Sequence, residues 1–211
     1  MREKKPIIII GNGGHSKVLT EILQLNQCEI IGFTSPKNEE NVYNLSFLGN
    51  DSIVYNYSQE NILLVNAIGS TQLPVLRKKI FQKFSKAGYK FAQVVHPSAI
   101  VSSYSLLGEG AQILAGVVIQ PFAEVADNTI VNTAASIDHD CRIGAHCHIA
   151  PGAVLSGNVL IGQGSHIGTG SIIIQGIKVG EQVLVGAGSL ILKDVNDQAV
   201  VYGTPAKEVR K

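Results

Sequence analysis

Residues 137–172 read IDHDCR IGAHCH IAPGAV LSGNVL IGQGSH IGTGSI when they are written in groups of six, and an aliphatic residue opens every group. The same register continues on both sides, so that Val, Leu or Ile stands at every sixth position from Val101 to Ile191. A second register, two residues before the first, holds small or β-branched residues from Ala99 to Ser189. An α-helix repeats about every 3.6 residues and a strand every second residue, so neither element alone produces this period.

A strict period of six over 96 residues predicts a parallel β-helix, with one bulky aliphatic side chain per group in the core, a small residue near it and a turn after it. A β-sandwich is the alternative for many short strands, but sandwich strands do not keep one phase over this length. Glycine often follows the aliphatic residue directly, where we expect an unusual backbone conformation. These glycines are Gly108, Gly144, Gly162, Gly168, Gly180 and Gly186.

The N-terminal third has a different pattern. Ile7–Ile10 is a β-branched run that predicts a strand, and apolar residues at helical spacing follow from Val18. The intervening Gly11-Asn12-Gly13-Gly14-His15 predicts a glycine turn that lets a phosphate reach the N-terminus of the helix, with the charge of Lys17 nearby. A tight turn without a ligand is the alternative for this stretch.

Further elements complete a small Rossmann-like α/β domain at residues 1–96, with a β-helix domain at 97–194 and a C-terminal tail at 195–211. Runs of β-branched and aromatic residues predict strands at 29–33, 62–67 and 91–95. A helix is expected from about 74 to 87, ending at Gly88, and the polar stretch 37–58 is expected to be a loop.

Composition excludes several classes of protein. The 211 residues carry a formal charge of +1 with acids and bases interspersed, which gives no footprint for nucleic acid or an anionic membrane. The basic start before Ile7–Ile10 is far too short for a signal segment or a membrane span, so we expect a cytoplasmic protein without membrane insertion. The three cysteines show no CxxC spacing, and no metal site is expected from them.

The order of motifs resembles the sialic acid O-acetyltransferase (NeuD/PglD-like) family of hexapeptide-repeat sugar acetyltransferases, and especially its UDP-4-amino-sugar N-acetyltransferases of bacillosamine-type synthesis. The resemblance implies a left-handed β-helix, acetyl-CoA as co-substrate, a nucleotide-sugar acceptor, and a homotrimer with active sites between subunits. It rests on the glycine turn with Ser16-Lys17-Val18, Ala67-Ile68-Gly69, Arg77-Lys78-Lys79-Ile80, His96-Pro97-Ser98-Ala99, Asn132-Thr133, His139-Asp140-Cys141-Arg142, Ser156-Gly157-Asn158 and Gly203-Thr204-Pro205-Ala206-Lys207.

The resemblance also implies roles for single residues on the acceptor side. Gly13, Gly14 and His15 lie at the phosphates of the sugar nucleotide, and Asn132 holds the acceptor sugar. Uridine-nucleotide binders of the family usually carry aspartates just after the second strand, where this chain has Thr34-Ser35-Pro36.

For catalysis, the resemblance makes His139 the general base, oriented by Asp140, while the N–H of Gly157 faces the thioester oxygen. An unperturbed imidazole pKa near about 6.5 suits this role. His146 and His166 receive no role. The residues implied to contact coenzyme A are His148, Gly157, Gly168, Gly186, Ala187, Pro205 and Lys207.

These inferences together predict an acetyl-CoA-dependent N-acetyltransferase for the 4-amino group of a nucleotide-linked sugar, acting in surface polysaccharide or glycan synthesis. An O-acetyltransferase of sialic acid or another glycan precursor is the first alternative, since one base serves an amine or a hydroxyl. A metal-dependent hydratase of the γ-carbonic-anhydrase kind would need three histidines that meet at a subunit interface. His139, His146, His148 and His166 make that count possible, and the 18 residues between His148 and His166 place these two one coil apart. A non-catalytic trimeric scaffold is the last alternative.

Overall fold

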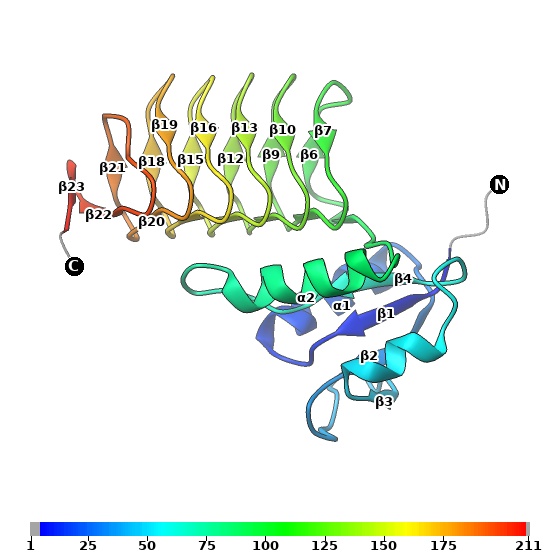
Figure 1. Ribbon diagram of the computed structural model, residues 1–211. Helices are drawn as coiled ribbons and strands as arrows, with labels where there is room; N and C mark the ends of the chain where they lie inside the picture. The colour runs from blue at the N-terminus through cyan, green and yellow to red at the C-terminus, as the bar shows by residue number, and fades with distance from the viewer. Residues whose placement is uncertain (1–4, 210–211) are drawn as a thin grey trace.

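The computed structural model describes residues 5–209, so the basic start at residues 1–4 and the last two residues of the predicted tail lie outside it. The period of six appears as a succession of two-residue strands (Figure 1). Their bounds are β5 Val94–Val95, β6 Ile100–Val101, β7 Leu106–Leu107, β8 Gln112–Ile113, β9 Val118–Ile119, β10 Glu124–Val125, β11 Ile130–Val131, β12 Ser136–Ile137, β13 Arg142–Ile143, β14 His148–Ile149, β15 Val154–Leu155, β16 Leu160–Ile161, β17 His166–Ile167, β18 Ile172–Ile173, β19 Lys178–Val179, β20 Leu184–Val185 and β21 Leu190–Ile191.

Three strands make one coil of a left-handed parallel β-helix, and each strand pairs in parallel with the strand 18 residues further on, as Ile130 does with His148. Face 1 contains β5, β8, β11, β14, β17 and β20; face 2 contains β6, β9, β12, β15, β18 and β21; face 3 contains β7, β10, β13, β16 and β19. The turns form corner 1–2, corner 2–3 and corner 3–1, each named after the two faces that it joins. The hairpin of β22 (Val200–Gly203) and β23 (Ala206–Glu208) extends face 1 at the C-terminal end.

The predicted core registers are confirmed. Ile113, Ile137 and Ile167 of the aliphatic register are completely buried, as are Ala135 and Cys141 of the small-residue register. Bulky side chains therefore stack on bulky ones from coil to coil, as Ile137 does on Leu155, while bulky and small side chains alternate along the chain and together fill the interior of the β-helix.

The expectation for the glycines after the aliphatic residue was wrong. Positive φ angles occur three residues after the aliphatic residue instead, at every sixth position from Gly110 to Gly188. Gly168, directly after Ile167, has another reason to be glycine: a Cβ there would lie 2.5 Å from the carbonyl oxygen of Val185 in the next coil. Close stacking of coils, and not the φ angle, requires glycine at this position.

The N-terminal domain is a parallel four-stranded sheet in the order β3-β2-β1-β4, with two helices. No helix of residues 5–209 is long and apolar enough to span a bilayer. The predicted first strand, the first helix and the second helix are confirmed, with ends that differ by at most a few residues. The bounds are β1 Ile7–Ile10, α1 Gly14–Leu25, β2 Ile30–Thr34, β3 Phe47–Gly49, the 3₁₀ helix η1 Asp51–Asn56, β4 Leu63–Asn66 and α2 Val75–Lys86.

The segment 37–58 was predicted to be a loop, but it contains β3 and η1. Its few apolar residues are sufficient: the ring of Phe47 lies 5.7 Å from that of Phe33, and Val54 is completely buried. The predicted strand at 91–95 is shorter than expected, because Phe91 makes only an isolated bridge with Leu64. The rest of that segment leaves the domain and becomes β5, the first strand of face 1.

The N-terminal domain packs on face 1 (Figure 1). Leu114 and Ile130 of the β-helix belong to the hydrophobic cluster beneath α1. Arg77 of α2 is completely buried between the domains, where it donates hydrogen bonds to the carbonyl oxygens of Asn66 (2.6 Å) and Asn128 (3.2 Å). These contacts fix the glycine turn beside corner 1–2.

Candidate active site

His139 and Asp140 lie at corner 2–3, in the turn between β12 and β13. Nδ1 of His139 is 2.7 Å from Oδ2 of Asp140, and the backbone N–H of His139 donates to Oδ1 of Asp138 at 2.7 Å. Asp140 has φ +61°, a conformation that aspartate tolerates better than most residues. The short side chain of Asp140 therefore does reach the histidine.

The surroundings of His139 make its Nε2 more basic than that of a free histidine. The hydrogen bond that Nδ1 donates to Asp140, with the charges of Asp138 and Asp140, raises the pKa of His139 above its ordinary value of 6.5. Because a carboxylate only accepts hydrogen bonds, Nδ1 carries the proton and the lone pair of the neutral ring is on Nε2. This is the arrangement of a carboxylate-oriented general base.

Gly157 stands one coil further on at the same corner, beneath the imidazole. A Cβ on Gly157 would lie 2.6 Å from both Cε1 and Nε2 of His139. Any side chain at this position would displace the ring or cover its basic nitrogen. Among the described residues, the N–H of Gly157 has no hydrogen-bond partner, so it can donate to an oxygen of a ligand.

A second cluster lies between the domains, in a pocket of about 550 Å³ at corner 1–2. The pocket brings together five predicted residues, namely Gly13, Gly14, His15, Asn132 and His148. Its other walls are Val18, residues 67–71 of the loop after β4, and Leu114. Lys17 is exposed on α1 and does not line this pocket.

His15 is neutral in this pocket. Gln112 donates to the carbonyl oxygen of Asn66 at 2.8 Å, so its Oε1 accepts from Nε2 of His15 at 2.7 Å. Burial, reinforced by the charge of Arg77, lowers the pKa of His15 to about 4. The positive charge at the glycine turn therefore comes from the N-terminus of α1 at Gly14, and not from the imidazole.

His148 holds Asn132 and has no free nitrogen. Its Nδ1 lies 2.9 Å from the carbonyl oxygen of Ser70, so Nδ1 donates there, and Nε2 accepts from the amide of Asn132 at 3.1 Å. Burial lowers the pKa of His148 to about 3. The ring of His166 packs on it at 4.9 Å. His148 is thus a positioning residue for Asn132.

The histidines without a predicted role belong to the domain interface. His146 contacts Asn128 at 3.0 Å and packs on the ring of Phe81. No group of three His, Cys, Asp or Glu side chains suited to a metal ion occurs within residues 5–209. Both nitrogens of His148 are already hydrogen-bonded within this chain, so neither is free to bind a metal ion.

Five of the residues predicted for coenzyme A follow corner 1–2 beyond the pocket, whereas His148 lines the pocket and Gly157 lies at corner 2–3. Gly168 lies between β17 and β18, and Gly186 and Ala187 lie one coil later. Pro205 and Lys207 belong to the hairpin of β22 and β23, where the hydroxyl of Thr204 donates to the carbonyl oxygen of Gly188 at 3.1 Å. These residues form one line, in later coils than the pocket.

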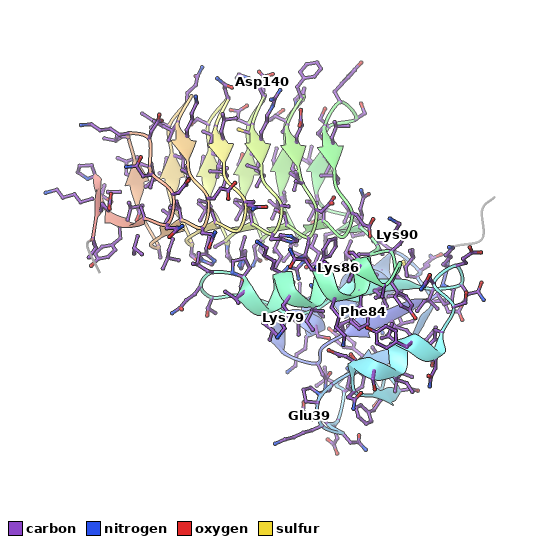
Figure 2. All side chains as sticks on the ribbon, in the orientation of Figure 1. Glu39, Lys79, Phe84, Lys86, Lys90 and Asp140 are labelled. Atoms are coloured by element: carbon purple, nitrogen blue, oxygen red, sulfur yellow. The ribbon has the colours of Figure 1, made fainter. Side chains whose placement is uncertain are left out.

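Within one chain, the two halves of the predicted site are separated. The pocket and the line of residues from Gly168 to Lys207 are at corner 1–2. His139, Asp140 and Gly157 are at corner 2–3, and face 2 lies between the two corners. Figure 2 shows Asp140 on the edge of the β-helix that points away from the N-terminal domain.

The sequence predicted no role for Arg77 and Gln112, which both bind the carbonyl oxygen of Asn66 beside the pocket, or for Asp51, which lies outside the pocket lining. Asp51, at the start of η1, accepts a hydrogen bond from the hydroxyl of Thr34 at 2.6 Å. It thereby brings a carboxylate to the end of β2, where the sequence itself has no acid. No sequence signal links Asp51 to Thr34, because their contact depends on β3, which was not predicted.

One family match falls in each domain, and the second spans only the later coils of the β-helix. Residues 6–84 match the PglD N-terminal domain, and residues 158–193 match the hexapeptide repeat of succinyl-transferase. The acetyltransferase domain of PglB from Neisseria gonorrhoeae FA1090 is 36% identical with a TM-score of 0.91, over 97% of this chain and 100% of that chain. The chain belongs to the PglD-like family of hexapeptide-repeat sugar acetyltransferases.

Other PglD-like proteins are also similar. PerB from Caulobacter crescentus, solved in complex with CoA and GDP-perosamine, is 34% identical with a TM-score of 0.90 over 97% of each chain. The GDP-perosamine N-acetyltransferase of Escherichia coli O157:H7 is 29% identical over 91 residues, which is 40% of this chain and 38% of that protein. That match therefore spans well under half of the curated relative.

Proposed function

We propose that this PglD-like protein transfers the acetyl group of acetyl-CoA to the 4-amino group of a nucleotide-linked amino sugar. The observation that carries the proposal is the His139–Asp140 pair, whose free Nε2 lies against the bare backbone of Gly157. The relatives solved with acetyl-CoA, or with CoA and GDP-perosamine, support the choice of donor and acceptor class.

The chemistry follows from these groups. The amine of the acceptor attacks the thioester carbonyl, and Nε2 of His139 takes the proton that the amine loses. The N–H of Gly157 donates to the developing oxyanion. When the tetrahedral intermediate collapses, the carbon–sulfur bond breaks and the proton on His139 passes to the thiolate, which leaves as free coenzyme A.

A homotrimer is part of the proposal, because a complete site needs both corners. Corner 2–3 of one chain would meet corner 1–2 of the next in a heterologous contact, and the triangular cross-section of the β-helix lets three such contacts close a ring. Face 2, between the two corners, exposes Ile100 (68%), Val154 (40%) and Ile172 (45%), an aliphatic surface that supports burial between subunits. The cytoplasmic location expected from the sequence also belongs to this proposal.

Thiol release from acetyl-CoA tests the proposal on a panel of UDP-4-amino sugars, GDP-perosamine, and free and CMP-linked sialic acid. We expect turnover with a 4-amino sugar nucleotide that falls by roughly a hundredfold or more in His139→Ala. His96→Ala, which removes another histidine at the domain junction, is the matched control and should keep its activity. Turnover only with hydroxyl acceptors, or an active His139→Ala variant, would overturn the assignment.

A further inference from the structure

Two aromatic side chains stand exposed at corner 2–3, next to the proposed base. Tyr104 is 69% exposed and Phe122 is 61% exposed, and their ring centroids are 5.8 Å apart. Large apolar side chains that remain together on the surface of a chain generally mark a binding surface. Neither residue contributes to the core of the β-helix, so folding does not explain them.

Phe122 also has an unfavourable backbone conformation. Its φ is +62°, and the other residues with a positive φ at this position of the turns, from Gly110 to Gly188, are Gly, Asn, Asp, Gln, Ala or His. A bulky residue in the left-handed region is rare and costs conformational energy that glycine would avoid. Since the ring is mostly exposed, packing within the chain does not compensate for this cost.

The aromatic pair is in line with Asp140, the residue next to His139. Tyr104, Phe122 and Asp140 occupy the same turn position in successive coils, and the N–H of Asp140 donates to the carbonyl oxygen of Pro121 at 3.3 Å. On the other side, the N–H of Asn158 donates to the carbonyl oxygen of His139 at 2.8 Å. His139 therefore has aromatic rings on its N-terminal side and the bare Gly157 on its C-terminal side.

We propose that Tyr104 and Phe122 form an aromatic platform that binds the apolar C–H face of the acceptor sugar beside His139. A pyranose ring exposes C–H groups on its faces, and these pack on the electron-rich face of an aromatic ring. The inference rests on the proposed function and specifies which groups of the same site recognise the sugar itself.

The position along the β-helix axis favours the acceptor over the donor. The pocket includes Leu114 in the coil of Phe122 and Asn132 in the coil of His139, so in a ring of parallel chains the platform would face that pocket. Gly168 and Gly186 lie in later coils, on the Gly157 side. The acceptor thus approaches His139 from the aromatic side, and the thioester approaches from the glycine side.

Steady-state kinetics on the full chain test the platform, with the acceptor and acetyl-CoA varied separately. For Phe122→Ala and Tyr104→Ala we expect the KM for the sugar nucleotide to rise about tenfold, while the KM for acetyl-CoA and the oligomeric state are unchanged. Phe122→Tyr should retain the wild-type KM. Leu25→Ala removes a side chain of similar exposure, 53%, at the far end of α1 and serves as the control.

Phe122→Gly separates binding from folding. Glycine relieves the positive φ, so the variant should keep or raise the melting temperature while it raises the KM for the acceptor as Phe122→Ala does. An unchanged acceptor KM in these variants, or dissociation of the oligomer that accounts for the loss, would overturn the platform. If the wild type has no turnover, the proposed function fails instead. Calorimetric titration of the wild type and of Phe122→Gly with GDP-perosamine then decides whether the platform binds the sugar, because the platform predicts weaker binding by the variant.

Discussion

The imidazole of His139 and the α-carbon of Gly157 are so close that a methyl group on Gly157 would lie 2.6 Å from Nε2. The basic nitrogen is therefore accessible only because residue 157 has no side chain. Gly157→Ala should reduce kcat/KM by on the order of a hundredfold, since a displacement of about 1 Å suffices for such a loss. Ser156→Ala, the neighbouring control, should have near wild-type kinetics; an active Gly157→Ala enzyme would contradict the assigned geometry.

The pH profile should report the pair of His139 and Asp140. The histidine acts as a base only when it is neutral, so kcat/KM should rise with pH through a pKa above 6.5 and then level off. Asp140→Asn removes the largest cause of the raised pKa, so the rising limb should move to lower pH. The plateau should also fall, on the order of a hundredfold, because an amide N–H facing Nδ1 favours the wrong tautomer. A rising limb that does not move in the variant would assign it to another group.

Asp51 should contribute to nucleotide binding through its place at the end of β2. In glycine-turn α/β folds, a carboxylate at this strand end accepts hydrogen bonds from the ribose hydroxyls. Asp51→Asn should weaken equilibrium binding of the nucleoside diphosphate about tenfold or more, with little effect on kcat. Thr34→Val keeps the carboxylate but removes its hydrogen bond, so its effect should be smaller. Equal nucleotide affinity in all three proteins would contradict this role.

The domain interface should weaken in mild acid. Burial lowers the pKa values of His15 and His146 to about 4 and that of His148 to about 3, whereas the unfolded chain protonates histidine near 6.5. Between these values the unfolded state binds more protons, so the free energy of unfolding decreases as the pH falls from about 6.5 towards about 4. Above pH 6.5 these groups add no pH dependence.

Melting temperatures measured from pH 8 to pH 5 test this prediction, in a range where most carboxylates stay ionised. The melting temperature should be flat above pH 7 and decrease below it, and His146→Gln should decrease less steeply. His139→Ala, which removes an exposed histidine, should not flatten the curve. A wild-type melting temperature that is constant down to pH 5 would contradict the neutral interface.

The fold was predictable because every coil repeats the same six-residue pattern of aliphatic and small residues. The aliphatic residues from Val101 to Ile191 must all point inward for the coils to stack, and so they record the architecture directly. The strand–turn–helix at Ile7–Leu25 was equally local. In contrast, β3 and η1 are held by few apolar residues in a polar stretch, where tertiary packing and not local pattern decides the structure.

The site was only partly predictable for a similar reason. Sequence adjacency linked His139 to Asp140, whereas Gly157 was named only through the family resemblance. The hydrogen bonds that keep His15 and His148 neutral come from Gln112, Ser70 and other groups that are distant in sequence. The division of the site between two corners follows from the order of faces in the coil, which only the structure gives.

Subunit complementation tests the central claim that the site combines corner 2–3 of one chain with the pocket of another. One inactive variant is His139→Ala, and the other is Gly14→Glu. A Cβ at residue 14 meets no atom within 4 Å, and a carboxylate is favourable at the N-terminus of a helix, so Gly14→Glu should fold. Its negative charge should block the pocket. When the two inactive variants are dissociated and reassembled together in equal amounts, about one quarter of the sites should have both intact halves, with a corresponding share of wild-type activity. Activity no higher than that of the two variants alone would show that each chain builds its own site and would contradict the account.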